Sequence, residues 1–150
     1  MSNNPSISVI VPVLNEEGSL DKFYIETSTA LREYSDWEMI FVDDGSDDES
    51  FNIIRGIAEK DSRVTVIQFF KNFGKADALS EGFNQANGDV VITIDADLQD
   101  DPAEIPRLIT KIQDGWDVVS GWKKDRKDPA SKRIPSKLFN LVTRIFTGIK

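Results

Sequence analysis

The residues best suited to chemistry are Asp95 and Asp97, which follow the apolar run of residues 90–94. An apolar, β-branched run that stops at carboxylates is typical of a buried strand whose carboxyl end emerges at a site. The two side chains face one point if the extended conformation persists to Asp97. Two oxygen ligands suit Mg²⁺ or Mn²⁺, with water and a substrate phosphate completing the shell. An acidic turn before a helix, with Asp101 as its cap and Pro102 as its first residue, is the alternative without a metal.

The composition limits which groups can act at such a site. The chain has no His, so the usual general base and the commonest metal ligand are missing, and chemistry must rest on carboxylates. It has no Cys, which excludes disulfides and thiolate chemistry and fits a reducing compartment. Its 150 residues, 39% of them apolar, suffice for one domain with a core. Neither a signal peptide nor an apolar run of the roughly 20 residues that span a bilayer is expected.

The charge is divided between an acidic body and a basic C-terminal part. The net charge is −8, yet residues 122–150 carry nine Lys and Arg against two Asp. This asymmetry predicts a negatively charged partner at the C-terminal part and argues against nucleic acid as a partner of the body. We therefore expect an α/β core over residues 1–121, continued within the same domain by a basic loop and amphipathic helix over residues 122–150.

The elements that must position the acids follow from the apolar pattern. Strands are expected over residues 6–13, 37–42, 64–70, 90–94 and 117–121, with regular pairing of the first ending at Pro12. Helices are expected after Ser19, after a capping box of Ser46 and Glu49, after Lys75, and over residues 102–113. The third is expected to turn Phe83 and other apolar side chains inward. The alternation of strand and helix predicts a mostly parallel sheet with helices on both faces.

Acidic side chains follow three of these strands. In a parallel α/β sheet, ligands bind outside the carboxyl ends of the strands. The acids at these ends are Glu16 and Glu17, Asp43 and Asp44, and Asp95 and Asp97. Their convergence on one edge predicts a nucleotide and metal site. Neither the dinucleotide-binding glycine pattern nor the P-loop pattern occurs.

The C-terminal part has its own pattern. From residue 134 an apolar stripe at helical spacing is flanked by Lys and Arg. A basic amphipathic helix can lie in a membrane interface against anionic lipid, or it can dock on the core of its own domain. The sequence leaves both open.

Five segments together resemble a known family. They are VIVPVLNEE at 9–17, VDDGS at 42–46, NFGKA at 72–76, DADLQDDP at 95–102 and SGWKKDR at 120–126. In this order they resemble the family 2 glycosyltransferases of the GT-A fold, an α/β fold for nucleotide-diphospho-sugar transfer. More narrowly, they resemble the polyprenyl-phosphate glycosyltransferases, the group that contains dolichol-phosphate mannosyltransferase.

The resemblance implies roles for single residues. Those implied to line the base and ribose pocket after the first strand are Pro12, Leu14, Asn15 and Glu16. Asp44 would hold the nucleobase or ribose, and Lys75 would lie near the nucleotide. Asp95 and Asp97 would form the catalytic metal motif, with Gln99 near the metal or sugar. Simpler structural roles stay open: a strand end at Pro12, a turn at Asp44, a solvated lysine at Lys75 and a helix entry at Gln99.

The resemblance also implies an acceptor side. Lys123 and Arg126 would approach the acceptor phosphate, although Lys123 stands where relatives often carry Arg and lacks the bidentate fork. Relatives continue well past residue 150, so we expect a C-terminally truncated chain that represents the N-terminal, donor-binding part. The protein is expected in the cytoplasm, peripheral to the membrane or, in a longer form, anchored in it.

The implied activity is an inverting transfer of a sugar from a nucleoside-diphosphate sugar, with UDP favoured, to a polyprenyl phosphate. A divalent cation would stabilise the leaving diphosphate. The acceptor phosphate is already ionised, so the missing His is no obstacle. Three alternatives remain: a sugar nucleotidyltransferase, a receiver-like binding module with a phosphorylatable Asp, and a silent fragment that docks on membranes.

Overall fold

A computed structural model describes residues 4–121, which contain four strands and their flanking helices. In chain order the elements are β1 (Ile7–Val13), α1 (Leu20–Ala30), β2 (Trp37–Asp43), α2 (Ser50–Ala58), β3 (Val64–Gln68), α3 (Lys75–Gln85), β4 (Val90–Thr93), the 3₁₀ turn η1 (Pro102–Glu104) and α4 (Ile105–Gln113). The predicted loop and helix of residues 122–150, including Lys123 and Arg126, lie outside the described residues. In residues 4–121, no helix is both long enough and apolar enough to cross a bilayer.

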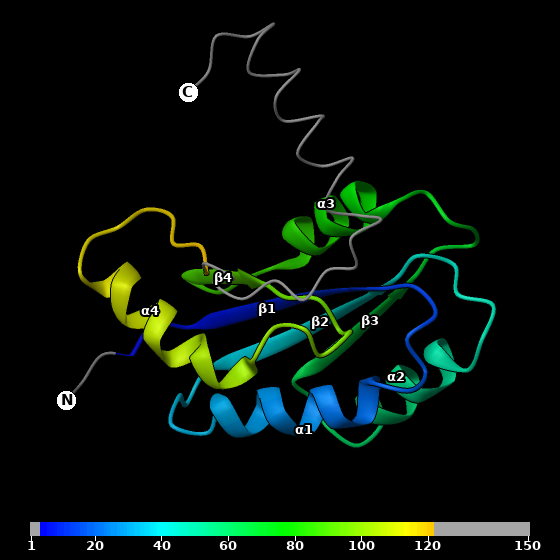
Figure 1. Ribbon diagram of the computed structural model, residues 1–150, viewed down its shortest axis with the longest axis horizontal. Helices are drawn as coiled ribbons and strands as arrows, with labels where there is room; N and C mark the ends of the chain where they lie inside the picture. Colours follow the sequence, from blue (N-terminus) through cyan, green and yellow to red (C-terminus); the bar gives the residue numbers. More distant parts are fainter. Residues whose placement is uncertain (1–3, 122–150) are drawn as a thin grey trace, which may run out of the picture. The chain divides into compact units, whose positions relative to one another are not determined.

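The strands form one parallel sheet in the order β3-β2-β1-β4. From β1 the chain moves outward through β2 to β3, and α3 then returns it to the opposite side of β1. Helices α1, α2 and α4 cover one face of the sheet and α3 covers the other (Figure 1). The predicted mostly parallel sheet with helices on both faces is confirmed. The direction of winding reverses between β1 and β4, which is where open α/β sheets form their ligand crevice.

Alternating side chains of β1 pack on the two faces. Val9 and Val11 belong to the large cluster under α1 and α2, where the Phe23 and Phe41 rings meet edge to face at 6.3 Å. Ile10 points to the other face and contacts Gly82 of α3, where an added Cβ would overlap the Ile10 side chain. Each fully buried apolar side chain contributes about 1.5–3 kcal/mol relative to exposure, so both faces hold β1 in register.

Pro12 ends the pairing of β1 on one side only. Toward β2 the register continues through Val13, opposite Asp43, whereas toward β4 it stops at Ile10, opposite Thr93. Successive residues of a strand direct their N–H groups to opposite neighbours, and Ile10 faces β4 because its carbonyl accepts from Ile94 N at 3.2 Å. Pro12 therefore lacks a donor only toward β4. The prediction that pairing ends there is correct for β4 and wrong for β2.

The predicted strand over residues 117–121 is wrong. This segment pairs with no strand among residues 4–121, and the Val118 side chain is 83% exposed. A short apolar pair such as Val118 and Val119 forms a strand only where a neighbouring strand is available for hydrogen bonding. Local sequence does not show whether such a neighbour exists. β3 likewise ends at Gln68 rather than residue 70, which leaves Phe70 exposed.

Two details of the helices also differ from expectation. The capping box of Ser46 and Glu49 does not form, because α2 begins at Ser50 and Asp48 accepts from the Ser50 N–H at 2.9 Å. Phe83 of α3, predicted to face inward, is 52% exposed. The Asp101 cap, part of the alternative interpretation without a metal, does form: its carboxylate accepts from Ala103 N at 2.9 Å and caps η1, which leads into α4.

Candidate functional site

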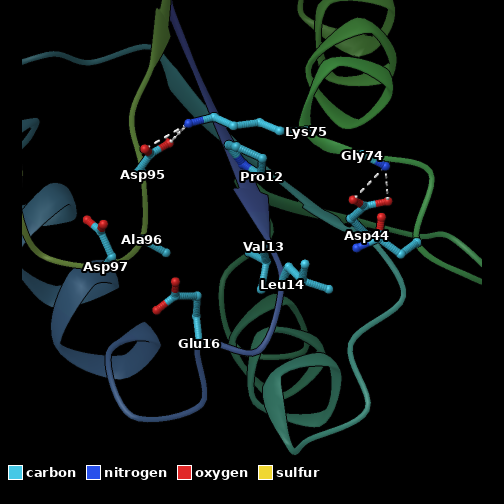
Figure 2. A pocket seen from close by; sticks show the side chains of 11 residues that line it. Pro12, Val13, Leu14, Glu16, Asp44, Gly74, Lys75, Asp95, Ala96 and Asp97 are labelled. Carbon is cyan, nitrogen blue, oxygen red and sulfur yellow. Dashed lines mark hydrogen bonds and ion pairs between the residues drawn. The ribbon is translucent and has the colours of Figure 1, made fainter. Parts of the chain in front are cut away.

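A pocket lies at the carboxyl ends of the strands, at the switch point between β1 and β4 (Figure 2). Its volume of about 350 Å³ is in the range of small-ligand sites. Its lining comes from the end of β1 and the segment after it, from the segments after β2 and β4, and from the loop between β3 and α3 with the first residue of α3. The lining residues are Pro12, Val13, Leu14, Glu16, Asp44, Asn72, Gly74, Lys75, Asp95, Ala96 and Asp97. The fold therefore brings together most of the residues predicted from sequence.

Asp95 is bound by a lysine across the pocket. The ammonium of Lys75, the first residue of α3, contacts both carboxylate oxygens of Asp95, at 2.5 and 2.7 Å (Figure 2). The two side chains are 58% and 41% exposed, so water reaches the pair. The pocket thus holds Asp95 with a cation already beside it.

The extended conformation of β4 does not persist to Asp97, which was the condition for Asp95 and Asp97 to face one point as strand neighbours. A turn forms at Ala96 and Asp97, and Leu98 takes a left-handed conformation with φ of 59°. Asp97 nevertheless lines the same pocket as Asp95, and its carboxylate accepts from the backbone N–H of Gln99 at 3.0 Å. A non-glycine residue in this conformation is strained, and such strain is common where a loop must aim functional groups. The Gln99 side chain is exposed and does not line the pocket.

Asp44 is buried and holds the segment that precedes α3. It is 2% exposed, and its carboxylate accepts from Phe73 N at 2.7 Å and from Gly74 N at 2.9 Å. Gly45, with φ of +75°, lets the backbone pass so close to Asn72 that an added Cβ would lie 2.7 Å from its nitrogen. The carboxylate of Asp44 is therefore used mainly to position the loop that carries Lys75.

Asp43, beside it, is fully buried. One oxygen accepts from Ser46 N at 3.3 Å, and the other has no hydrogen-bond partner in the described part of the chain. A buried carboxylate oxygen without a partner is costly and uncommon in folded proteins. It marks the carboxyl end of β2 as locally unfavourable for stability.

The loops after β1 and β2 are tied together by reciprocal bonds. Asn15, with φ of 56°, donates its N–H to Ser46 Oγ and accepts from Asp47 N with its side chain, both at 3.0 Å. Glu17 accepts from Glu49 N at 3.0 Å in the same way. Asn15 is exposed and does not line the pocket. Its side-chain amide holds the loop after β1, and the next residue of that loop, Glu16, lines the pocket.

Four pocket residues were not assigned a role from sequence: Val13, Asn72, Gly74 and Ala96. Asn72 and Gly74 lie in the segment NFGKA, after β3 and at the same sheet edge as the acids. Their position after a strand, at the same edge of the sheet, was the feature of the sequence that could have predicted them as pocket residues. Their contribution depends on the folding of residues 72–75 around Asp44, which the sequence pattern does not show.

The pocket fits a hard divalent cation that shares its ligands with a phosphate. Glu16, Asp95 and Asp97 supply carboxylates, and Asp95 already binds one cationic group. Within residues 4–121, no three acidic side chains lie close enough to form a complete ion cage. Mg²⁺ and Mn²⁺ are commonly held by one or two carboxylates, with water and substrate phosphate oxygens completing the shell. The donor set therefore suits such an ion when a phosphate ligand is also present.

These features define an α/β protein with an acidic ligand pocket at the switch point of a parallel sheet. Residues 8–149 match the model of the glycosyl transferase family 2, and the chain belongs to this family. The predicted family and the predicted GT-A-type fold are thereby confirmed. Membership argues against a receiver-like module or a nucleotidyltransferase.

One curated relative is the undecaprenyl-phosphate 4-deoxy-4-formamido-L-arabinose transferase of Pseudomonas fluorescens, 46% identical over 145 residues. The match covers 95% of this chain and 43% of that protein, so the chain spans less than half the length of this relative.

Solved structures of glycosyltransferases share the fold. One is a mannosyltransferase from Pyrobaculum calidifontis in complex with GDP-Man and Mn²⁺, with a TM-score of 0.55 at 27% identity. The match covers 64% of this chain and 28% of that chain. A second structure is glucosyl-3-phosphoglycerate synthase from Mycobacterium tuberculosis, in complex with Mn²⁺, UDP and phosphoglyceric acid. Its TM-score is 0.56 at 29% identity, and the match covers 72% of this chain and 39% of that chain.

Proposed function

We propose that the pocket binds the nucleoside-diphosphate sugar of a glycosyltransferase that delivers the sugar to a polyprenyl phosphate. The observation that carries this proposal is that Glu16 from the loop after β1, Asp95 and Asp97 from the loop after β4, and Lys75 from the start of α3 meet in one pocket. Relatives named as undecaprenyl-phosphate sugar transferases support the acceptor class. A UDP-sugar is favoured as donor, and the relatives solved with UDP or GDP-Man support a nucleoside diphosphate.

The pocket residues suit both the nucleoside and the diphosphate of a nucleoside-diphosphate sugar. Pro12 and Leu14, the latter 42% exposed, offer an apolar wall for the base, and Glu16 can accept from ribose hydroxyls. Asp44 acts on the nucleotide chiefly through the loop of residues 72–75 that it holds. The diphosphate would lie near Lys75, where a positive side chain meets the acidic edge.

Asp95 and Asp97 would hold the divalent cation, which supplies stabilisation of the negative charge that grows on the leaving diphosphate. The acceptor is a phosphate oxygen that is ionised at neutral pH, so no general base has to remove a proton. Attack by that oxygen on the sugar carbon, with departure of the nucleoside diphosphate, inverts the configuration in one displacement. A chain without His is compatible with this reaction.

The acceptor side of the proposal rests on residues outside those described. The basic residues of 122–150, with Lys123 and Arg126 among them, would attract the lipid phosphate and an anionic membrane surface. With this partner, the proposed enzyme would work on the cytoplasmic side, peripheral to the membrane or, in a longer form, anchored in it.

Calorimetric titration of UDP-glucose, UDP and GDP, with and without Mn²⁺, tests the donor site. We expect metal-dependent binding in the unsubstituted chain and its loss in Asp95→Asn/Asp97→Asn, because the amides remove both anionic ligands. Asp101→Asn is the matched control: it lies in the same acidic segment but outside the pocket lining, and Asn is also a good helix cap. A folded chain that binds none of the three nucleotides contradicts the proposal.

A further inference from the structure

The ion pair between Lys75 and Asp95 occupies the carboxylate that the proposed ion requires. The ammonium contacts both Asp95 oxygens, at 2.5 and 2.7 Å, and both side chains line the pocket. In the proposed site, where Asp95 and Asp97 are the two protein ligands, a divalent ion would take at least one of these oxygens. An ammonium and a divalent cation at the same carboxylate repel each other at this short range. Lys75 must therefore move before Asp95 can bind an ion.

The pair is built so that it can open. With side chains 58% and 41% exposed, it is a solvent-accessible salt bridge, and such pairs contribute little net stability. Lys75 is the first residue of α3, and the bonds from Asp44 to Phe73 and Gly74 hold its backbone at the pocket. The long side chain can swing while its base stays fixed.

We propose that Lys75 is the resident counter-ion of Asp95 and passes to the donor diphosphate when a divalent ion takes its place. The inference rests on the proposed function and goes beyond it by assigning an exchange of partners to these two residues. The displaced ammonium needs an anion. Of the other carboxylates that line the pocket, Glu16 and Asp97 are themselves needed by ribose and ion. The third, Asp44, is buried and already accepts from two backbone N–H groups. The diphosphate is the anion that arrives with the metal.

The exchange makes the two ligands cooperative. A divalent ion alone must displace Lys75 without giving it a new partner, so it binds weakly. A diphosphate alone must draw Lys75 away from Asp95 and leaves that carboxylate without a cation. When both bind, each group regains a partner, and the coupling is reciprocal by thermodynamic linkage. The acidic pocket thereby avoids binding metal when no donor is present.

The first test is the affinity of the full chain for Mn²⁺ alone, measured by electron paramagnetic resonance of the free ion. Lys75→Met removes the competing ammonium and is expected to bind Mn²⁺ at least about fivefold more tightly than the unsubstituted chain. Lys75→Arg keeps the charge and is expected to bind it no more tightly. Lys71→Met is the matched control, because the Lys71 ammonium lies 5.0 Å from the Phe73 ring and the residue is not in the pocket lining.

A Lys75 that merely braces α3 against β4 predicts the opposite. In that case Lys75→Met would loosen Asp95, and the Mn²⁺ affinity would be unchanged or lower. Either result contradicts the proposed exchange of partners. This arm uses no nucleotide, so it stands even if the donor proposal fails. In a second arm, the factor by which Mn²⁺ tightens UDP binding is expected to fall at least about fivefold in Lys75→Met. An unchanged factor also overturns the proposal, whereas absence of UDP binding in every variant counts against the donor site alone.

Discussion

The amino ends of the strands are closed by polar side chains that bind one another and nearby backbone N–H groups, whereas the carboxyl ends leave charged side chains around an open pocket. At the amino end, Ser8 Oγ donates to Glu38 at 2.7 Å and accepts from Gly88 N at 2.8 Å. Ser6 donates through both its hydroxyl and its N–H to Asp89, and these bonds hold the pKa of that carboxyl below its usual range. These contacts join β1 and the residue that precedes it to neighbouring segments.

The carboxyl end shows the reverse. Asn15 and Leu98 have positive φ, Asp43 keeps one buried oxygen without a partner among residues 4–121, and the Lys75–Asp95 pair is open to water. Strain and unsatisfied groups persist where the surrounding structure over-determines them, and they cluster at functional sites. The difference indicates that the amino end contributes stability, whereas the carboxyl end, where the ligand site is proposed, is less stable. Substitutions at the two ends should separate these properties.

The largest effect is expected from Gly45→Ala at the carboxyl end. The new Cβ would overlap the backbone of Lys71 and Asn72, and Ala is strained at φ of +75°. Displacing this loop also moves Lys75, so we expect a loss of about 3 kcal/mol in the free energy of unfolding and roughly tenfold weaker nucleotide binding. Urea denaturation and calorimetry measure the two.

Gly56→Ala is the control for that substitution. Gly56 lies in α2, and among the described residues no atom lies within 4 Å of its added Cβ. Alanine there is expected to raise the free energy of unfolding by up to about 1 kcal/mol. If Gly45→Ala proves as harmless as Gly56→Ala, the two loops do not pack against each other at Gly45.

An intermediate effect is expected from Ser8→Ala at the amino end. It leaves the half-buried N–H of Gly88 and the Glu38 carboxylate without their shared partner, which costs about 2 kcal/mol of unfolding free energy. Nucleotide affinity is expected to stay unchanged, because Ser8 lies at the opposite end of the strand from the pocket. Ser28→Ala is the control: this half-buried hydroxyl of α1 donates only to carbonyls of its own helix, so its loss should change stability by less than about 0.5 kcal/mol. Weaker nucleotide binding in Ser8→Ala would show that the two ends are coupled.

The smallest effect is a pH dependence at the same end. Arg63 makes a bidentate pair with Asp61, to which Tyr24 also donates, and these bonds hold the Asp61 pKa far below its usual range. Because the folded pKa is lower than the unfolded value of about 3.9, the stabilisation is fully present above that pH. It is lost as the pH falls below about 3.9 through the folded pKa.

Asp61→Asn should therefore lower the unfolding free energy by about 1 kcal/mol at pH 7, a modest figure because Arg63 is half-exposed. The difference from the unsubstituted chain should shrink between pH 4 and pH 2, as measured by urea denaturation at each pH. A difference that is constant with pH would mean that the Arg63 pair does not stabilise the charged form of Asp61.

Much of the fold followed from local sequence. Apolar periodicity located four strands and the helices between them, and the cap of Asp101 before Pro102 formed as predicted. The positions of Glu16, Asp44 and Asp95 directly after apolar runs were enough to predict that these acids lie at one edge of the sheet. These features depend on residues within a few positions of one another, so the sequence reports them directly.

The tertiary structure decided the partners. β4 lies beside β1, and this arrangement brings Asp95 to Lys75; no spacing in the chain encodes which carboxylate that lysine meets. Asp44 turned out to be used for the loop of residues 72–75, and residues 117–121, which looked like a strand, found no neighbour to pair with among the described residues. Sequence determined which groups reach the edge of the sheet, because patterning and capping are local. Only the order of the strands determined which of those groups meet, because contacts between distant segments depend on how the sheet is assembled.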